Sequence, residues 1–220
     1  MTLVIAVDGP AGSGKSSAAK GAARALGLRY LDTGAMYRAV TWWMLHHKVP
    51  ADDPDAVAAY ATAPVIEIGA DPDAPAVYVD GTDVSAPIRD REVSNAVSTV
   101  ASVPAVRERL VALQREVIGA GGIVVEGRDI GTVVAPAAAV KVFLTASEAV
   151  RAQRRAKDLA ADPAASVQVT LSEQARRDRI DSTRKASPLS KAPDAVEIDS
   201  TRLGLDEVIE AIVRLAKDHQ

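Results

Sequence analysis

A glycine-rich segment near the start of the chain has residue types and a spacing suited to holding phosphate. Residues 9–16 read GPAGSGKS, with Gly in the first and sixth positions, Lys in the seventh and Ser in the eighth. Glycine allows backbone turns that point successive N–H groups at phosphate oxygens, and a following helix adds the positive end of its dipole. Lys15 can neutralise the β- and γ-phosphates of a nucleotide, and the Ser16 hydroxyl can bind Mg²⁺. The segment therefore predicts a nucleotide phosphate site.

The remaining sequence narrows the class of phosphate-binding protein. A GTPase would carry an Asn-Lys-x-Asp segment that reads guanine, but the single asparagine, Asn95, is followed by Ala96. Motor and transporter ATPases need more chain than 220 residues. A small phosphotransferase is the class that remains.

Two further segments carry candidate groups for the acceptor. Asp32 and Thr33 can cap a helix, and Tyr37 and Arg38 would project from its first turns. Residues 126–131, EGRDIG, follow a buried apolar run, and open α/β sheets bind their ligands at the carboxyl ends of such strands. The arginine and aspartate in this segment either contact a phosphate and a base or pair with each other at the surface.

Two groups of charged residues recur at helical spacing: Arg151, Arg154 and Arg155, and then Arg177, Asp181 and Arg184. Each group shares one helix face. Such faces are often only solvated. Beside a phosphate loop, however, planar guanidinium groups can clamp a transferring phosphoryl group.

The elements that must position these groups alternate along the chain. Short apolar runs predict buried parallel strands, and the segments between them predict helices. This alternation predicts an α/β fold, a P-loop-type parallel sheet flanked by helices. The predicted strands cover residues 3–7, 123–125, 140–144 and 196–198, and the predicted helices cover residues 15–26, 104–118, 147–159 and 206–217.

Two segments depart from this alternation. Residues 65–68 and 76–81 alternate in polarity and include an Asp-Gly turn, so we predict a small antiparallel β lobe, a hairpin, inserted at about residues 63–90. Residues 160–166 read as a mobile loop between two Arg-bearing helices. Trp42 and Trp43 are expected to pack in the core.

Composition excludes several other functions. The chain has 26 Lys and Arg against 29 Asp and Glu, so we expect no nucleic-acid partner. It has no cysteine, which excludes thiolate catalysis, disulfides and Cys-ligated metals, and its three histidines are not spaced as a metal pair. No apolar run reaches the roughly 18 residues of a membrane span, and the start carries no basic leader, so we expect a cytoplasmic protein without a membrane partner.

Taken together, the motifs resemble those of bacterial cytidylate kinases, which belong to the P-loop nucleoside monophosphate kinases. The matching segments are GPAGSGKSS at 9–17, LDTGAMYR at 31–38, SNAVSTVASVPAVRERL at 94–110, EGRDIGTVV at 126–134, RAQRR at 151–155 and RIDSTRKASPL at 179–189. They span nearly the whole chain in a consistent order. The lobe at 63–90 also resembles the CMP-binding insert of this family.

The resemblance implies transfer of the ATP γ-phosphate to CMP or dCMP with Mg²⁺ at Ser16. ATP would be bound by Gly9, Pro10, Ala11, Gly12, Ser13, Gly14, Lys15, Ser16, Ser17 and Arg151. CMP would be bound by Thr33, Tyr37, Arg38, Ser98, Arg107, Arg128, Asp129, Arg177, Asp181 and Arg184. The catalytic groups would be Lys15, Arg128, Arg154, Arg155 and Arg184.

Within these sets the resemblance implies a distinct role for each group of residues. Ser98, Arg107 and Asp129 would read cytosine, and Asp181 would lie near the sugar. Arg128, Arg177 and Arg184 would face phosphate. Thr33 stands where some relatives have serine, a change that keeps the hydroxyl.

The resemblance also implies one domain made of a core (about 1–62, 91–150 and 186–220), the CMP-binding insert (about 63–90) and a lid (about 151–185). We expect a monomer. The competing interpretations are another small P-loop kinase, acting on UMP, AMP or a metabolite such as shikimate or gluconate, and a non-catalytic nucleotide-binding regulator.

Overall fold

The computed structural model describes residues 2–158 and 167–219, and the loop predicted at 160–166 lies outside these residues. Its main sheet has five parallel strands in the order β2-β6-β1-β7-β8. The strands are β1 (Val4–Asp8), β2 (Arg29–Asp32), β6 (Ile123–Gly127), β7 (Val140–Thr145) and β8 (Val196–Asp199). The central strands are apolar runs because helices cover both faces of the sheet. The predicted α/β class is confirmed.

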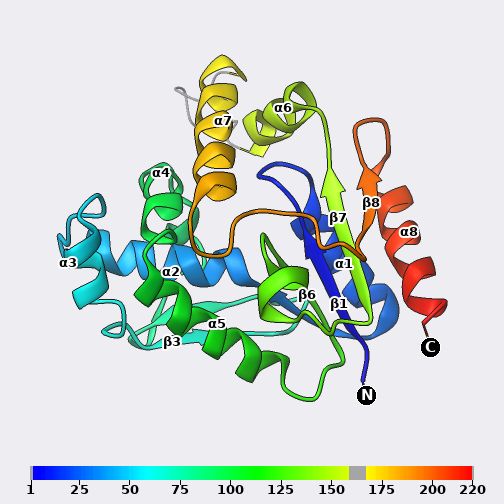
Figure 1. The fold of residues 1–220 in the computed structure, drawn as a ribbon, viewed down its shortest axis with the longest axis horizontal. Coiled ribbons are helices and arrows are strands. Elements are labelled where there is room, and N and C mark those ends of the chain that lie inside the picture. Colours follow the sequence, from blue (N-terminus) through cyan, green and yellow to red (C-terminus); the bar gives the residue numbers. More distant parts are fainter. Residues whose placement is uncertain (1, 159–166, 220) are drawn as a thin grey trace.

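The helices form a layer on each side of this sheet (Figure 1). On one side, α1 (Lys15–Leu26) and α8 (Leu205–Lys217) pack on the face that carries Ile5 and Val7 of β1. On the other side, α2 (Thr33–His46), α4 (Arg91–Val100) and α5 (Pro104–Ile118) share a core with Ala6. Successive side chains of one strand therefore serve two separate apolar clusters.

A small three-stranded antiparallel sheet forms the inserted lobe: β3 (Ile66–Ile68), β4 (Val77–Val79) and β5 (Thr82–Asp83). The predicted pairing of the first two strands is confirmed, but the hairpin interpretation missed β5. The Asp80-Gly81 turn joins β4 to β5, with both residues at positive φ. Two short helices flank the lobe, α3 (Pro54–Ala59) and the 3₁₀ turn η1 (Pro87–Arg89).

The aromatic pair on α2 packs as predicted. Trp43 is buried in the core and donates a hydrogen bond to Asp80 Oδ2 at 2.8 Å, which connects α2 to the lobe. Trp42 is half-buried against the same core and stacks on His46.

Two further helices, α6 (Glu148–Asp158) and α7 (Val167–Thr183), lie together at one end of the molecule (Figure 1). They pack closely on the phosphate loop that follows β1. Gly12 in this loop has a positive φ, and a Cβ there would lie 2.5 Å from Gln174 Nε2 of α7. The backbone carbonyl of Arg151 would lie 3.0 Å from the same Cβ, and the positive φ strains any other residue, so this position favours glycine.

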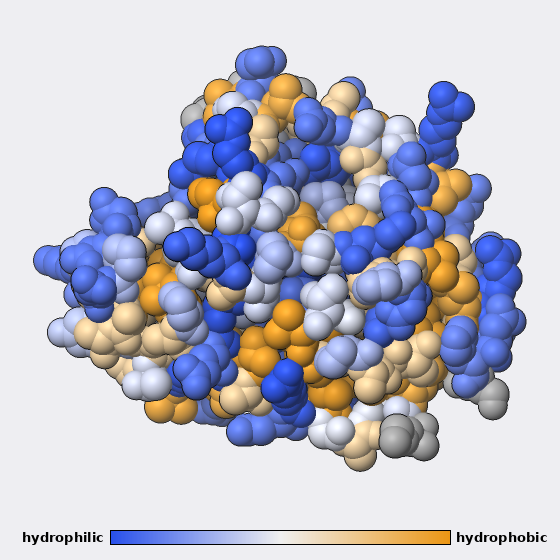
Figure 2. Space-filling view, viewed as in Figure 1, coloured by the Kyte–Doolittle hydropathy of each residue, from blue (hydrophilic) through white to orange (hydrophobic). Residues whose placement is uncertain are grey.

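The outer surface is mostly polar. Figure 2 shows polar residues over much of the visible face, with apolar residues in separate groups. In the described part of the chain, no helix is both long and apolar enough to cross a membrane.

Candidate active site

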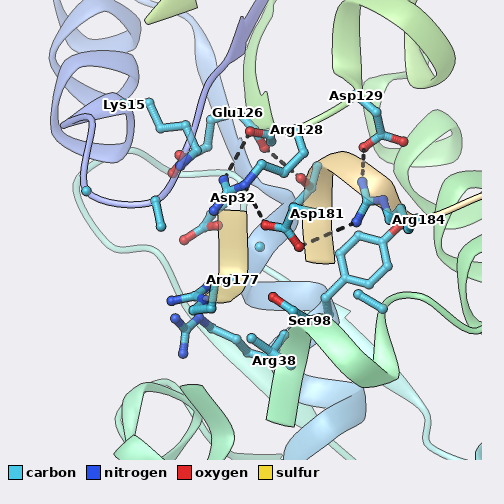
Figure 3. A pocket seen from close by; sticks show the side chains of 18 of the residues that line it. Lys15, Asp32, Arg38, Ser98, Glu126, Arg128, Asp129, Arg177, Asp181 and Arg184 are labelled. Carbon is cyan, nitrogen blue, oxygen red and sulfur yellow. Dashed lines mark hydrogen bonds and ion pairs between the residues drawn. The ribbon is translucent and has the colours of Figure 1, made fainter. Parts of the chain in front are cut away.

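A cavity of about 180 Å³ lies where β1 and β6 end, between the phosphate loop and helices α2, α4 and α7 (Figure 3). All ten residues predicted for the acceptor line it: Thr33, Tyr37, Arg38, Ser98, Arg107, Arg128, Asp129, Arg177, Asp181 and Arg184. Ala11, Gly12 and Lys15 of the phosphate loop line the same cavity. Residues far apart in the sequence thus share one space.

This cavity concentrates positive charge in a chain whose formal net charge is −3. Its lining includes seven Lys or Arg side chains and four carboxylates. Burial, together with neighbouring Arg177 and Arg155, lowers the pKa of Arg38 to about 9. Burial and Arg128 likewise lower the pKa of Arg177 to about 10. Because these cations oppose one another out of water, a bound anion would relieve their repulsion.

Several buried polar groups in the lining have no hydrogen-bond partner. They are Tyr37 Oη, Arg107 Nε, Gln174 Oε1, Arg177 Nε and Arg184 Nη2. Buried donors and acceptors in proteins are normally satisfied, so a group of unsatisfied ones around one cavity indicates capacity kept for a ligand.

Helix α2 presents its first turns to the cavity. Asp32 caps the helix as predicted, with Oδ1 accepting from the Ala35 N–H at 2.9 Å. The Thr33 hydroxyl donates to the carbonyl of Glu126 at 2.7 Å, which fixes α2 against the end of β6. The Arg38 guanidinium donates to Ser94 Oγ of α4 at 2.8 Å and lines the cavity.

Arg107 and Asp129 form a buried ion pair, with 2.5 Å between Nη2 and Oδ2. The Arg107 guanidinium also lies over the Tyr37 ring, 5.2 Å from its centroid. The sequence left open whether Asp129 pairs at the surface or faces a ligand. In the structure Asp129 pairs with Arg107 rather than with Arg128, and both partners line the cavity.

The predicted face of α7 also points into the cavity rather than into solvent. Arg128 Nε donates to Asp181 Oδ2 at 3.1 Å, and Arg184 Nη1 lies 3.9 Å from Asp181 Oδ1. Burial alone would raise the pKa of Asp181, but Arg128 and Arg177 outweigh it and hold that pKa below its ordinary value. Asp181 therefore stays charged and orients the surrounding arginines.

Lys15 and Ser16 lie at the start of α1 beside a carboxylate that the sequence reasoning gave no role. Burial and the charge of Arg128 lower the pKa of Lys15 to about 7. Ser16 Oγ donates to Glu126 Oε2 at 2.9 Å, and the Tyr30 hydroxyl donates to Glu126 Oε1. Burial raises the pKa of Glu126. The position of Glu126 at the end of β6 was the signal that could have found it.

The oxygen groups near Ser16 fit Mg²⁺. Within the described residues there is no cluster of three His, Cys, Asp or Glu side chains able to hold a metal alone. Mg²⁺, however, is usually bound through one or two carboxylates together with substrate phosphates and water. A serine hydroxyl beside Glu126 matches that requirement.

A second cavity, of about 170 Å³, lies on the other side of the phosphate loop. We call the first the acceptor cavity and this one the donor cavity, after the substrates predicted for the residues that line them. Ser13, Gly14, Ser17 and Arg154 line it, as do apolar residues including Leu144, Leu203 and Val208. Sequence reasoning missed the segment from Ser200 to Leu205, which supplies much of this wall. It follows directly after β8, so its position at a carboxyl strand end was again the available signal.

The three arginines of α6 share a helical stretch but point to different places. Arg151 is buried and donates to the Ala11 carbonyl at 3.0 Å, and Arg154 donates to the carbonyls of Ser13 and Ser200. Arg155 instead lines the acceptor cavity, 3.4 Å from Ser94 Oγ. The single face expected from their spacing is therefore divided: Arg154 lines the second cavity, Arg155 lines the first, and Arg151 lines neither.

Comparison with known proteins agrees with this geometry. A solved structure of an uncharacterized protein from Eubacterium ventriosum, 11% identical, has the same fold with a TM-score of 0.54 over 99% of both chains. Cytidylate kinases of Streptomyces avermitilis and Mycobacterium avium are each 52% identical to this chain, covering 98% of it and 93% and 95% of their own lengths. A cytidylate kinase of a Geobacillus species is 47% identical over 97% of this chain and 96% of its own.

The family model for cytidylate kinase matches residues 5–218, which include the phosphate loop, the whole acceptor cavity and the segment after β8. This match and the high identity over nearly full length lead to one conclusion: the chain belongs to the cytidylate kinase family.

Proposed function

We propose that this protein transfers the γ-phosphate of ATP to CMP or dCMP, and that the residues predicted from the sequence do this work. The observation that carries the proposal is one continuous cavity that joins Lys15 of the phosphate loop to the Arg107–Asp129 pair. In the view of Figure 3, Lys15, Arg38 and Arg177 lie on one side and Asp129 and Arg184 on the other. The first side suits the acceptor phosphate, and the second suits its base. Arg184, which the resemblance placed at the phosphate, is therefore assigned to the base side, where it lies 3.8 Å from Asp129.

The acceptor phosphate needs no general base. Its second pKa is about 6, so it is already a dianion near neutral pH. An oxygen of this phosphate attacks the γ-phosphorus, the bond from that phosphorus to the β,γ-bridging oxygen breaks, and ADP leaves with the electron pair. The protein contributes position and charge compensation. Arg38, Arg128 and Arg177 hold the acceptor phosphate, and Lys15 balances charge on the donor.

Mg²⁺, when bound, neutralises charge on the β- and γ-phosphates. Ser16 and Glu126 are the residues that would hold it. Tyr30 fixes the orientation of Glu126, which in turn accepts a hydrogen bond from the Ser16 hydroxyl and so leaves the lone pairs of that hydroxyl oxygen free.

The base is recognised at the other end of the cavity. Cytosine offers a donor at N4 and an acceptor at N3, which match the Asp129 carboxylate and the Arg107 guanidinium. Uracil would place its O4 against the carboxylate and its N3–H against the guanidinium. Each mismatch costs on the order of 1–3 kcal/mol, so two together give about 10²–10⁴ in discrimination.

The lobe and the α6–α7 pair act as the moving parts of the single domain. We assign about residues 63–90 to the CMP-binding insert and about 151–185 to the lid. Closure of both would exclude water until ATP and CMP are bound, which prevents wasteful hydrolysis. We expect the protein to act as a monomer, and both substrates are nucleotides of the cytoplasm.

The test is a coupled assay of ADP release with ATP and Mg²⁺ and five acceptors: CMP, dCMP, UMP, AMP and shikimate. We expect CMP and dCMP to be the best acceptors and shikimate to be inactive. A strong preference for UMP, AMP or shikimate would assign the site to another small kinase. ATP binding without turnover of any acceptor would indicate a regulator.

A further inference from the structure

We propose that Asp8 is a positioning residue for base recognition: its carboxylate caps the turn that follows Asp129 and so frees Asp129 to face the acceptor cavity. The proposal rests on the proposed function, since it concerns how the same cavity reads a base. It adds a residue outside the phosphate loop and outside the cavity lining.

The geometry around Asp8 is specific. Asp8 is the last residue of β1 and only 4% exposed. Its Oδ1 accepts from the Ile130 N–H at 2.9 Å, and its Oδ2 accepts from the Gly131 N–H at 2.8 Å. The parallel register places Asp8 beside Gly127, so its side chain reaches the backbone just beyond the end of β6. One carboxylate thus joins the start of the phosphate loop to the segment that carries Arg128 and Asp129.

The turn after Asp129 is a single π-helical turn, Ile130–Val134, with Asp129 at its N-cap position. An aspartate at an N-cap usually accepts from the backbone N–H two or three residues ahead. Asp129 makes no such bond, and the Gly131 N–H donates to Asp8 instead. The Asp129 carboxylate is instead bonded to Arg107 and lies 3.8 Å from Arg184 Nη2.

In this arrangement Asp8 binds the N–H groups of the turn, and Asp129 pairs with Arg107 in the cavity. Without Asp8, Asp129 alone would have to do both. Without Asp8, the buried N–H groups of Ile130 and Gly131 would lose their acceptor, and buried amides strongly favour finding one. The nearest carboxylate in sequence is Asp129. We therefore expect it to turn toward its own helix and leave Arg107 without its partner in the cavity.

The experiment compares kcat/KM for CMP and UMP, with saturating ATP and Mg²⁺, in wild type, Asp8→Ala, Asp129→Ala and the double variant. We expect Asp8→Ala to narrow the CMP:UMP ratio by about tenfold or more, because base discrimination rests on paired polar groups. In the Asp129→Ala background, the same change should alter the ratio by less than about twofold, since coupled residues are not additive.

Asp53→Ala is the matched control. Asp53 also caps a helix, accepting from the N–H groups of Asp55 and Ala56, but it lies on α3 away from the cavity. Its loss should lower stability without changing the ratio. Asp8→Asn keeps the side-chain shape and one acceptor oxygen, so it should narrow the ratio less than Asp8→Ala, and it carries the test alone if the alanine variant does not fold.

Two results would overturn the proposal. One is a CMP:UMP ratio that stays at the wild-type value in the Asp8 variants, whether or not both activities fall in equal proportion. The other is a ratio change that multiplies fully with that of Asp129→Ala, because the two residues would then act independently. Failure of wild-type protein to phosphorylate CMP would instead contradict the proposed function, so the two failures are distinguishable.

Discussion

The two cavities beside the phosphate loop use arginine in opposite ways. On the acceptor side, Arg107, Arg177 and Arg184 each keep a buried N–H group without a hydrogen-bond partner. On the donor side, Arg154 directs its guanidinium group at a carbonyl of the loop itself, and so does Arg151, which lines neither cavity. Unsatisfied donors leave hydrogen-bonding capacity for a ligand, whereas bonds to the loop carbonyls hold the phosphate loop in place.

The walls of the two cavities also differ in polarity. The acceptor cavity is lined largely by charged and polar side chains, and the donor cavity has an apolar wall that includes Leu144, Leu203 and Val208. A base on the acceptor side would be read by hydrogen bonds, and a base on the donor side would be held mainly by contact. The difference predicts strict choice of acceptor and looser choice of donor base.

The largest expected effect is at Lys15, which lies between the two sides. Lys15→Ala should lower kcat by about a thousandfold, because it removes charge compensation that matters most as the phosphoryl group transfers. CMP binding, measured by titration calorimetry, should change little. Lys20→Ala on the same helix is the control and should keep kcat. If Lys15→Ala kept more than about a tenth of wild-type kcat, this role would be wrong.

On the acceptor side, Arg38→Ala and Arg128→Ala should each lower kcat/KM for CMP by about a hundredfold, since charge-assisted bonds to phosphate are among the strongest polar contacts. Cytidine, which lacks the phosphate, should not be a substrate. The control is Arg24→Ala, an arginine paired with Asp73 on the exposed surface. Unchanged CMP kinetics in Arg38→Ala would return that residue to a purely structural role.

The next largest effects are expected on the choice between cytosine and uracil. Asp129→Ala should narrow the CMP:UMP ratio of kcat/KM by about 10–100-fold, and Arg107→Ala should act similarly, because each removes one side of the cytosine pattern. Ser98→Ala should have a weaker effect, since a neutral hydroxyl contributes less than a charge. If Asp129→Ala lowered kcat/KM for CMP and for UMP in equal proportion, the carboxylate would serve the phosphates or the fold instead.

The sequence predicted much of this arrangement, for identifiable reasons. Helices α1 and α5 begin and end at the predicted residues, since a glycine follows each helix and a proline starts α5. The acceptor residues meet because their motifs follow strands or lie on facing helices. Strand β2 and strand β5 were missed, because Tyr30-Leu31 is a very short apolar run and both residues of β5 are exposed.

What could not be predicted depends on long-range partners. Spacing alone places Arg151, Arg154 and Arg155 near one another, but the direction of each guanidinium depends on carbonyls more than 40 residues away or on Ser94 of α4. Likewise, nothing local to Asp8 indicates that its partners are the N–H groups of Ile130 and Gly131. These contacts exist only once the sheet has brought β1 and β6 together.

Asp8, at the boundary between the two sides, should also show in the pH dependence of stability. Burial raises its pKa to about 6 even though two N–H groups bind the charged form. Between about pH 4 and 6 the folded protein therefore binds a proton at Asp8 more tightly than the unfolded chain, so this contribution to stability grows as the pH falls. Relative to Asp8→Asn, wild type should gain on the order of 2 kcal/mol in unfolding free energy from pH 7 to 4.5. Urea unfolding at both pH values measures this difference. If wild type and Asp8→Asn differed in unfolding free energy by the same amount at both pH values, the raised pKa would be contradicted.

The smallest expected effects are at Arg154 and Arg155, neighbours in sequence that face different cavities. Arg154→Ala should raise KM for ATP by about tenfold or less, because it loosens Ser13 and the segment after β8 that form the donor wall. Arg155→Ala should leave KM for ATP nearly unchanged and lower kcat for CMP by a few-fold, as its guanidinium approaches the transferring phosphoryl group only on closure. Steady-state kinetics with each substrate varied in turn separates the two results.

Identical kinetic profiles for the two variants would mean that both arginines act as one clamp on a single cavity. Unaltered kinetics in the double variant would mean that this helix face is merely solvated. The expected split instead follows from the different atoms that these two side chains contact.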